Sequence, residues 1–297
     1  MAELKGQFLA PNADILPPSD DRIFKVLLTH HDAKKVLIDI ISAVIEQKVT
    51  NVEIRNVELP VSDINEKEER FDVNCTIENG DQVNVEMHST PIYETGVERK
   101  YFINKYMYFL TDLHSSQRSR GVEYGDLVRT YQIIFTSHTV FRKSPGFVSR
   151  FSMRDENGRQ FTDQINQIII ELSKLNDIIK KPVEELTTFE KWLLFLRFAP
   201  DTMQRNKIND IIREKEEIGM ASAILQEISQ DEKEKARIRS RKMAEMDNYS
   251  NMKVLERIEK RGEEKANKKW EGVVAEKDAE IAQLRLQMAE MEANRNS

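Results

Sequence analysis

Residues 71–88 read FDVNCTIENGDQVNVEMH, and this stretch decides the fold of the chain. Apolar and polar side chains alternate strictly on both sides of Glu78-Asn79-Gly80. An alternation of period two is typical of strands that bury one face. A short segment containing Asn-Gly between two such runs is typical of a tight turn. The stretch therefore predicts an antiparallel β-hairpin.

Packing selects between two registers of this hairpin. A two-residue Asn79-Gly80 loop would place Val73 opposite Glu86, and both faces would then mix apolar and charged side chains. A three-residue loop with Gly80 in the left-handed conformation pairs apolar with apolar residues instead. Those pairs are Phe71–Met87, Val73–Val85 and Cys75–Val83, with Asn74 across from Asn84. We therefore predict the three-residue loop.

The same register sets two carboxylates face to face. Asp72 lies across from Glu86, and the β-carbons of opposed residues are about 4.5–5.5 Å apart. Two such carboxylates repel unless a proton or a cation lies between them. Oxygen-only ligands suit Mg²⁺ or Mn²⁺ rather than zinc. With His88 one pleat further on the same face, the three residues form a candidate site, and the alternative is the solvated polar face of an edge hairpin.

Five short motifs surround and include this hairpin, in a fixed order over roughly residues 20–200. An Asp on one strand, a tight turn and Glu-x-(Lys/Gln/His) on the next strand resemble the active-site hairpin of the PD-(D/E)XK nuclease superfamily. The set is similar to the Rpn group of recombination-promoting nucleases, also described as PD-(D/E)XK family transposases. The five motifs are Asp21-Arg22-Ile23-Phe24-Lys25, Glu86-Met87-His88, Gly121–Leu127, Glu171-Leu172-Ser173-Lys174 and Leu186–Leu196.

The resemblance implies a restriction-endonuclease-like core and a metal-dependent endonuclease that cuts double-stranded DNA with low sequence specificity. It implies that Asp72 and Glu86 bind Mg²⁺ (or Mn²⁺) together with the backbone carbonyl of Met87. In the same comparison, Lys25 and Arg99 contact phosphates, and Asp21 supports the site from the start of its helix. Helix-dipole and surface roles are the alternatives for these three residues.

One position departs from the family pattern. The superfamily usually has Lys where this chain has His88, and the Rpn group usually has Gln. A lysine supplies a fixed positive charge beside the attacking water, whereas a neutral imidazole orients the water or binds metal. The alternative function is therefore a catalytically silent nuclease fold that acts as a DNA-binding or scaffold and oligomerisation module.

The remaining pattern predicts an α/β mixed-sheet core in the order α-β-β-β-α-β, followed by an all-helical extension. Ser19-Asp20-Asp21 caps the first helix, which His30-His31-Asp32 can interrupt with a turn. The other expected elements are a strand at Val52–Leu59, a helix at 97–113, a strand at Tyr131–Phe135, an apolar run at Gln167–Leu172 and a helical pattern from Val183 to Ile228.

The C-terminal part of the chain is densely charged and lacks proline. Trp270, Val274, Ile281, Leu284, Met288 and Met291 follow a heptad spacing that Lys277 interrupts. The spacing predicts a short coiled coil and a homo-oligomer, with a lone charged helix as the alternative. We expect a flexible tail at 1–18, a nuclease-like domain at 19–180, a helical region at 181–245 and a charged helix with coiled coil at 246–297.

Composition narrows the function classes. The 297 residues carry a net charge of −6, which argues against a protein that coats nucleic acid by bulk charge. Residues 113–160 are nevertheless basic, with eight basic and four acidic side chains, and could form a phosphate-docking surface or a solvated face. One cysteine, no signal-like segment and no long apolar run indicate a cytoplasmic protein without a membrane span. Phosphate-loop, Rossmann, serine-hydrolase and zinc-protease motifs are absent from the sequence.

Overall fold

A computed structural model describes residues 7–55, 73–90, 97–117 and 123–231, and single positions between 240 and 285. The chain divides into two units, Met1–Glu232 and Lys233–Ser297. The described positions of the second unit are helical. In the described part of the chain, no helix combines the length and the apolarity needed to cross a bilayer.

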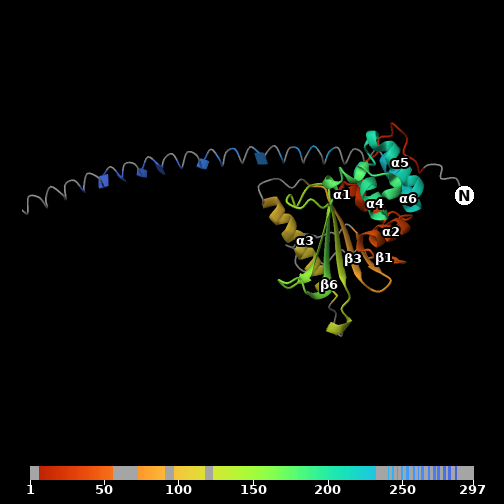
Figure 1. Cartoon of the computed structure of the whole chain (residues 1–297), viewed down its shortest axis with the longest axis horizontal. Coiled ribbons are helices and arrows are strands. Elements are labelled where there is room, and N and C mark those ends of the chain that lie inside the picture. The colour runs from red at the N-terminus through yellow and green to blue at the C-terminus, as the bar shows by residue number, and fades with distance from the viewer. Residues whose placement is uncertain are drawn as a thin grey trace, which may run out of the picture. The chain divides into compact units, whose positions relative to one another are not determined.

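The first unit is built on a six-stranded mixed sheet (Figure 1). The strand order is β1-β2-β3-β4-β6-β5, in which β3, β4 and β6 are mutually parallel and the other pairs are antiparallel. The strands are β1 (Val52–Ile54), β2 (Val73–Ile77), β3 (Gln82–His88), β4 (Thr130–Thr136), β5 (Val148–Arg154) and β6 (Gln160–Glu171). The carboxyl ends of the three parallel strands therefore lie side by side. They form one edge of the sheet that runs across the strands, and this is the edge meant below.

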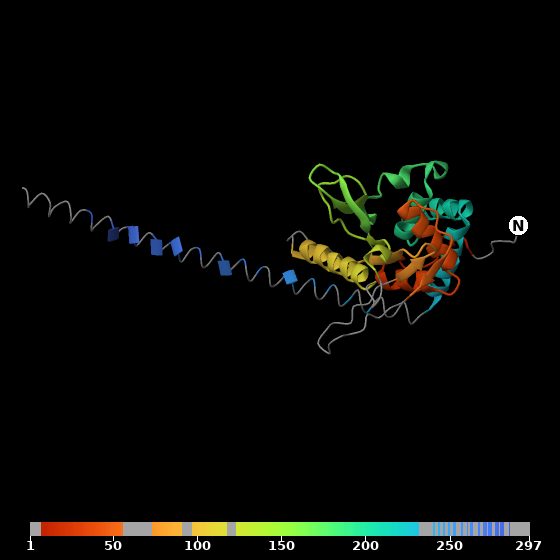
Figure 2. The ribbon, with the colours of Figure 1, turned by 90° about the horizontal axis from the view of Figure 1, so that it is seen from below.

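Helices cover both faces of this sheet. Figures 1 and 2 show α3 (Val97–Ser115) on one side and the other helices gathered on the opposite side. Those helices are α1 (Asp21–Thr29), α2 (Lys34–Ile45), α4 (Thr188–Phe198), α5 (Arg205–Glu214) and α6 (Glu216–Gln230). The predicted order α-β-β-β-α-β is confirmed from α1 to β4, and the mixed α/β architecture is compatible with a nuclease-like core.

The first helical segment begins and breaks where the sequence predicts. The Asp20 carboxylate accepts hydrogen bonds from the backbone N–H groups of Arg22 and Ile23, which are left without a partner in the first turn of α1. The helix ends at Thr29, and α2 begins at Lys34 after the His30–Ala33 turn. Both helices bury a continuous apolar face, which places them against the sheet.

The hairpin between β2 and β3 has the predicted register. Val73 pairs with Val85, Asn74 with Asn84 and Cys75 with Val83. The loop has three residues, since the Ile77 N–H donates to the Asp81 carbonyl, and Gly80 adopts a φ of 91°. Glycine meets this positive φ without the steric cost that a β-carbon brings. Phe71 and Asp72 lie outside the described residues, so the Asp72–Glu86 pair stays a prediction.

The sheet extends further than the sequence predicts. The apolar run at Gln167–Leu172 is the end of β6, which begins at Gln160, and β5 was not predicted at all. Strand β5 is an outer strand of the sheet, and its side chains are half-buried or exposed. Neither a continuous apolar run nor an apolar face therefore marks it. The helical pattern from Val183 resolves into a short 3₁₀ turn followed by α4, α5 and α6.

The segment before α1 packs against the last helices of the unit. The backbone N–H and carbonyl of Leu9 bond with the Asn209 side chain on α5, at 2.9 and 3.0 Å. The Leu16 N–H donates to Ser229 Oγ on α6 at 3.0 Å, and Leu9 is buried. These contacts join positions about two hundred residues apart in the sequence.

Candidate active site

Strand β3 presents its polar side chains to the face of the sheet that α3 covers. Gln82, Asn84, Glu86 and His88 alternate with the apolar residues of the other face, as the strand period requires. Glu86 is 3% exposed, and Asn84 Nδ2 donates to Glu86 Oε1 at 3.0 Å. A carboxylate is thus held, buried, near the carboxyl end of a central strand.

The surroundings of Glu86 supply further oxygen atoms. Asn74 and Asn84 are opposed in the register, both are buried, and the Oδ1 atom of each has no hydrogen-bond partner among the described residues. Buried polar atoms in native proteins are almost always satisfied, by protein, water or an ion. Carboxylate and amide oxygens are the ligands that Mg²⁺ and Ca²⁺ take. The residues around Glu86 therefore fit a hard divalent cation, and Asp72 would add a second carboxylate.

A row of amides continues across the sheet beside this position. Asn74, Asn84, Gln132 and Gln167 lie in register on four neighbouring strands, and Gln167 Nε2 donates to Gln132 Oε1 at 2.9 Å. The next row on this face, two residues closer to the carboxyl ends of the strands, contains Glu86, Ile134 and Ile169. The row of amides therefore makes one side of the site polar. Helix α3 packs on the two isoleucines beside Glu86.

His88 occupies a largely enclosed position against α3. Its Nδ1 atom lies 3.2 Å from the Tyr106 hydroxyl, and its ring meets the Phe102 ring edge to face at 4.9 Å between centroids. Burial, with smaller electrostatic contributions from Lys105 and His138 and against an opposing contribution from the Asp21 carboxylate, lowers the pKa of His88 to about 4. The imidazole of His88 is therefore neutral at pH 7.

The start of α1 reaches the same edge of the sheet. Ser137, directly after β4, donates its N–H to the His88 carbonyl at 3.1 Å and its hydroxyl to the Ser19 carbonyl at 3.0 Å. This connection brings the Asp21 carboxylate close enough to His88 to oppose the lowering of the His88 pKa. Lys25 is half-buried one turn further along α1.

Two other predicted residues lie around this edge. Met87, whose carbonyl is a metal ligand in the family that the chain resembles, is buried on β3 between Glu86 and His88. Arg99 is exposed near the start of α3, and its guanidinium lies 5.4 Å from the centre of the Phe141 ring. The structure thus brings Glu86, His88 and Asp21 together, whereas the Arg99 guanidinium lies over a ring of the loop after β4.

Two residues near His88 were not identified from the sequence. Tyr106 is buried, and no spacing in the sequence shows that its hydroxyl reaches β3. His138 follows β4 by two residues, and its Nε2 lies 2.9 Å from the Ser89 carbonyl. Since β3 and β4 are parallel, the residues after each strand meet at the same edge, and this was a usable signal for His138.

Comparison with protein families identifies a match that covers most of the chain. Residues 18–254 match a protein family described as PD-(D/E)XK nuclease family transposase. The matched range contains all the candidate residues named above and most of the first unit. No curated protein and no solved structure matches the chain.

Proposed function

Since the chain belongs to the PD-(D/E)XK nuclease family of transposases, we propose that it is a metal-dependent DNA endonuclease that hydrolyses phosphodiester bonds with low sequence specificity. The observation that carries the proposal is Glu86, a buried carboxylate beside amide oxygens and His88 at the carboxyl end of β3. A family of nucleases implies DNA as the substrate, and buried charges in proteins are paired or coordinate metals.

The cofactor of this proposal is a divalent cation. PD-(D/E)XK nucleases generally use divalent metals, commonly Mg²⁺ or Mn²⁺. In this chain Asp72, Glu86 and the backbone carbonyl of Met87 would hold the ion, and Asn84 orients the Glu86 carboxylate through its 3.0 Å hydrogen bond. When bound, such an ion lowers the pKa of water and stabilises the negative charge that develops on the phosphate.

His88 acts in this proposal as an orienting group rather than as a general base. A base with a pKa of about 4 accepts a proton poorly at pH 7, since catalytic bases work best with a pKa near the working pH. The neutral ring can still hold the attacking water by a hydrogen bond, and Tyr106 fixes the ring through Nδ1. Lys25 and Arg99 offset the phosphate charge.

The second candidate function is a catalytically silent nuclease fold that binds DNA or serves as a scaffold. The neutrality of His88 favours it, because the site lacks the fixed cation that lysine provides at this position. A silent fold that binds DNA shares this property with a nuclease, so cleavage and metal binding are the properties that separate the two candidates.

Plasmid nicking in Mg²⁺ tests the proposal with Glu86→Gln as the key variant. Removing the carboxylate should lower the nicking rate by at least about 10²-fold, a usual loss when a transition-state stabiliser is removed. Glu53→Gln is the matched control, because Glu53 is an exposed acid on β1 that shares a face of the sheet with Glu86. It should retain the wild-type rate.

The thermal midpoint in Mg²⁺ or Mn²⁺ provides a second measurement. An ion that binds the native state raises the midpoint by mass action, and Glu86→Gln should abolish that rise. Equal nicking by wild type and Glu86→Gln would end the assignment of the site. Wild-type protein that binds DNA but shows neither nicking nor a metal-dependent rise would establish the silent fold.

A further inference from the structure

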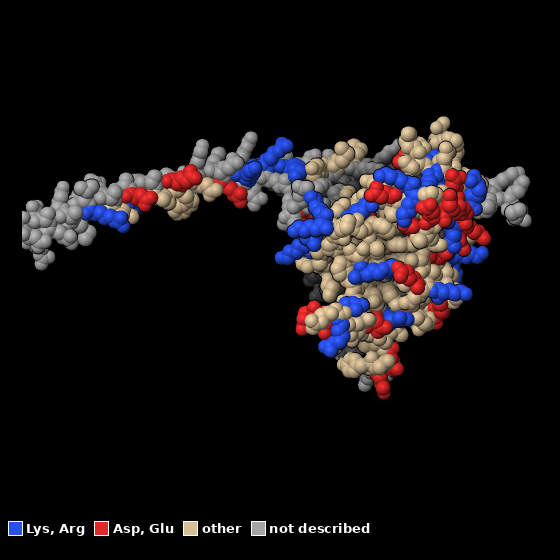
Figure 3. All heavy atoms as spheres, viewed as in Figure 1, with Lys and Arg blue, Asp and Glu red and all other residues tan. Residues whose placement is uncertain are grey.

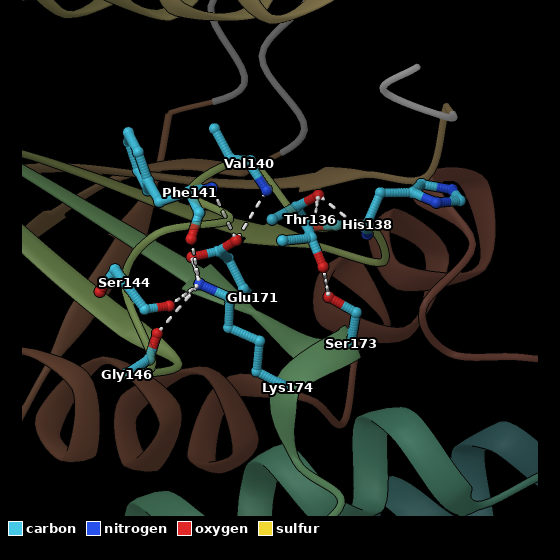
Figure 4. A network of polar contacts seen from close by, with 10 residues as sticks. Thr136, His138, Val140, Phe141, Ser144, Gly146, Glu171, Ser173 and Lys174 are labelled. Atoms are coloured by element: carbon cyan, nitrogen blue, oxygen red, sulfur yellow. Dashed lines mark hydrogen bonds and ion pairs between the residues drawn. The ribbon is translucent and has the colours of Figure 1, made fainter. Parts of the chain in front are cut away.

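The loop between β4 and β5, residues 137–147, is held by a carboxylate at the end of β6. Glu171 is fully buried, and its Oε1 atom accepts hydrogen bonds from the N–H groups of Val140 at 2.6 Å and Phe141 at 3.0 Å (Figure 4). Both donors lie in the first half of the loop. An ionised acceptor makes such bonds shorter and stronger than neutral ones.

Lys174 holds the same loop from Phe141 to Gly146. Its Nζ atom donates to the carbonyls of Phe141 at 2.7 Å and Ser144 at 2.8 Å, and contacts the Gly146 carbonyl at 3.2 Å. It also forms an ion pair with Glu171 Oε2 at 2.7 Å, and its side chain is 12% exposed (Figure 4). A further bond joins the hydroxyls of Thr139 and Ser173 at 2.8 Å. The loop is thus fixed from Thr139 to Gly146.

The fixed loop presents two cations to solvent. Arg142 and Lys143 are exposed, and they lie between Phe141 and Ser144, whose carbonyls Lys174 binds. Arg99 joins them, since its guanidinium lies over the Phe141 ring. Lys and Arg side chains gather on this side of the molecule, over the upper end of α3 (Figure 3).

This loop leaves the sheet at the edge that carries the candidate active site. His88, Thr136 and Glu171 are register partners at the carboxyl ends of β3, β4 and β6. The loop begins directly after Thr136, and Ser137 bonds to the His88 carbonyl. A polyanion that places one phosphate at Glu86 and His88 would therefore pass close to the loop.

Stability alone is a weak reason for a buried ion pair of this kind. The desolvation of Glu171 and Lys174 offsets much of their attraction, and apolar residues of similar volume often stabilise a fold as well. The pair instead fixes the shape of a surface loop. A loop that is already ordered loses less conformational entropy when it binds a partner.

We propose that Glu171 and Lys174 are positioning residues that hold the β4–β5 loop as a preorganised docking surface for the DNA backbone, with Arg142 and Lys143 against phosphates. The inference rests on the proposed function and extends it from the reacting phosphate to its neighbours. Contacts to phosphates add affinity without reading sequence, which agrees with an enzyme of low sequence specificity.

The first test removes the two charges. Binding of a short fluorescein-labelled DNA duplex to the full chain is followed by anisotropy in EDTA over a series of salt concentrations. Arg142→Ala/Lys143→Ala should lower the slope of log affinity against log salt by about 2, since each phosphate contact contributes about 0.9. Arg154→Ala/Arg159→Ala is the matched control, because both arginines are exposed around the β5–β6 turn at the opposite end of the sheet.

The control double variant should keep the wild-type slope. Equal losses in the two double variants would overturn the proposal in favour of diffuse attraction by the whole surface. An unchanged slope in Arg142→Ala/Lys143→Ala would overturn it as well, because the loop would then not contact the backbone.

The second test loosens the loop without removing its cations. Lys174→Gln should weaken DNA binding by about 10-fold, equivalent to about 1.4 kcal/mol, and leave the salt slope unchanged. In the nicking assay it should raise KM and leave kcat close to wild type, since neither Lys174 nor Glu171 touches the substrate. Thr139→Val, which removes the bond to Ser173 and buries no unpaired charge, is the milder variant if Lys174→Gln does not fold.

Leu193→Ala separates positioning from general destabilisation. Leu193 is fully buried in α4, and such a truncation costs about 2–5 kcal/mol. At a temperature where circular dichroism shows both variants folded, Leu193→Ala should bind DNA as the wild type does. An equal loss in Leu193→Ala, or none in the loop variants, would overturn the role of the loop. Wild-type protein that binds no DNA would instead overturn the proposed function.

Discussion

The Nδ1 atom of His88 and the hydroxyl oxygen of Tyr106 are 3.2 Å apart, and this contact joins the last residue of β3 to the buried face of α3. It fixes the orientation of the imidazole and occupies one ring nitrogen. Nε2 is then the nitrogen that can meet a water molecule or a phosphate. The helix thus sets the geometry of a side chain that it does not itself carry.

Tyr106→Phe should lower nicking without unfolding the protein. The variant keeps the buried ring and loses the bond to His88, which is worth about 1 kcal/mol, so the rate should fall by about five- to tenfold. Tyr131→Phe is the control, because the Tyr131 hydroxyl accepts a longer bond from Gln47 at 3.4 Å, away from His88. Equal rates for Tyr106→Phe and wild type would show that the contact does not position His88.

The pKa of His88 predicts how the nicking rate depends on pH. An unperturbed histidine titrates near 6.5, and the sequence alone predicts a loss of activity below that value. Burial moves the titration of the folded protein to about 4. Nicking should therefore show no His88-dependent step between pH 5 and 8, contrary to the expectation from sequence.

Linkage gives the sign of the stability effect. Below pH 6.5 the unfolded chain binds a proton at His88 that the folded protein excludes, so stability falls as the pH decreases to about 4 and is unaffected above 6.5. The full loss is about 3 kcal/mol. Urea unfolding of wild type and His88→Gln at several pH values isolates this difference. Curves that stay parallel from pH 7 to 4 would contradict the depressed pKa.

His88→Lys should preserve the nicking rate or raise it, by up to about tenfold, because a lysine adds positive charge beside the phosphate. Burial disfavours the charged form of a lysine as it does that of a histidine. The gain should therefore be largest at low pH and fade as the new ammonium loses its proton. A pH profile identical to that of the wild type would mean that charge at this position has no effect.

The heptad residues of the second unit predict association of chains. Trp270, Val274 and Ile281 are exposed in the single chain, and Leu284, Met288 and Met291 lie outside the described residues. Burying such side chains between chains contributes about 1.5–3 kcal/mol each before ordering costs. Light scattering should show a concentration-dependent oligomer for the full chain and a monomer for a chain ending at Ser250. A monomeric full chain at high concentration would contradict the coiled coil.

Alternation and turn chemistry predicted the described register of the β2–β3 hairpin, because gathering the apolar side chains on one face permits one register and Gly80 permits one loop. The same reasoning missed β5, whose outer position leaves its side chains exposed to water. It placed Glu86 and His88 on one face but could not predict that α3 encloses His88. The depressed pKa of His88 and its contact with Tyr106 follow from that tertiary packing, which sequence spacing does not encode.

The bonds of Leu9 to Asn209 and of Leu16 to Ser229 tie the beginning of the first unit to its last two helices. During synthesis the segment before α1 leaves the ribosome earlier than α5 and α6, so it cannot make these contacts until those helices have emerged. Folding of the unit is therefore completed late, after nearly all of its residues have emerged, and contacts of such high sequence separation form slowly. A nascent chain released before Ser229 would lack this closure, which couples the finished fold to completed translation of the unit.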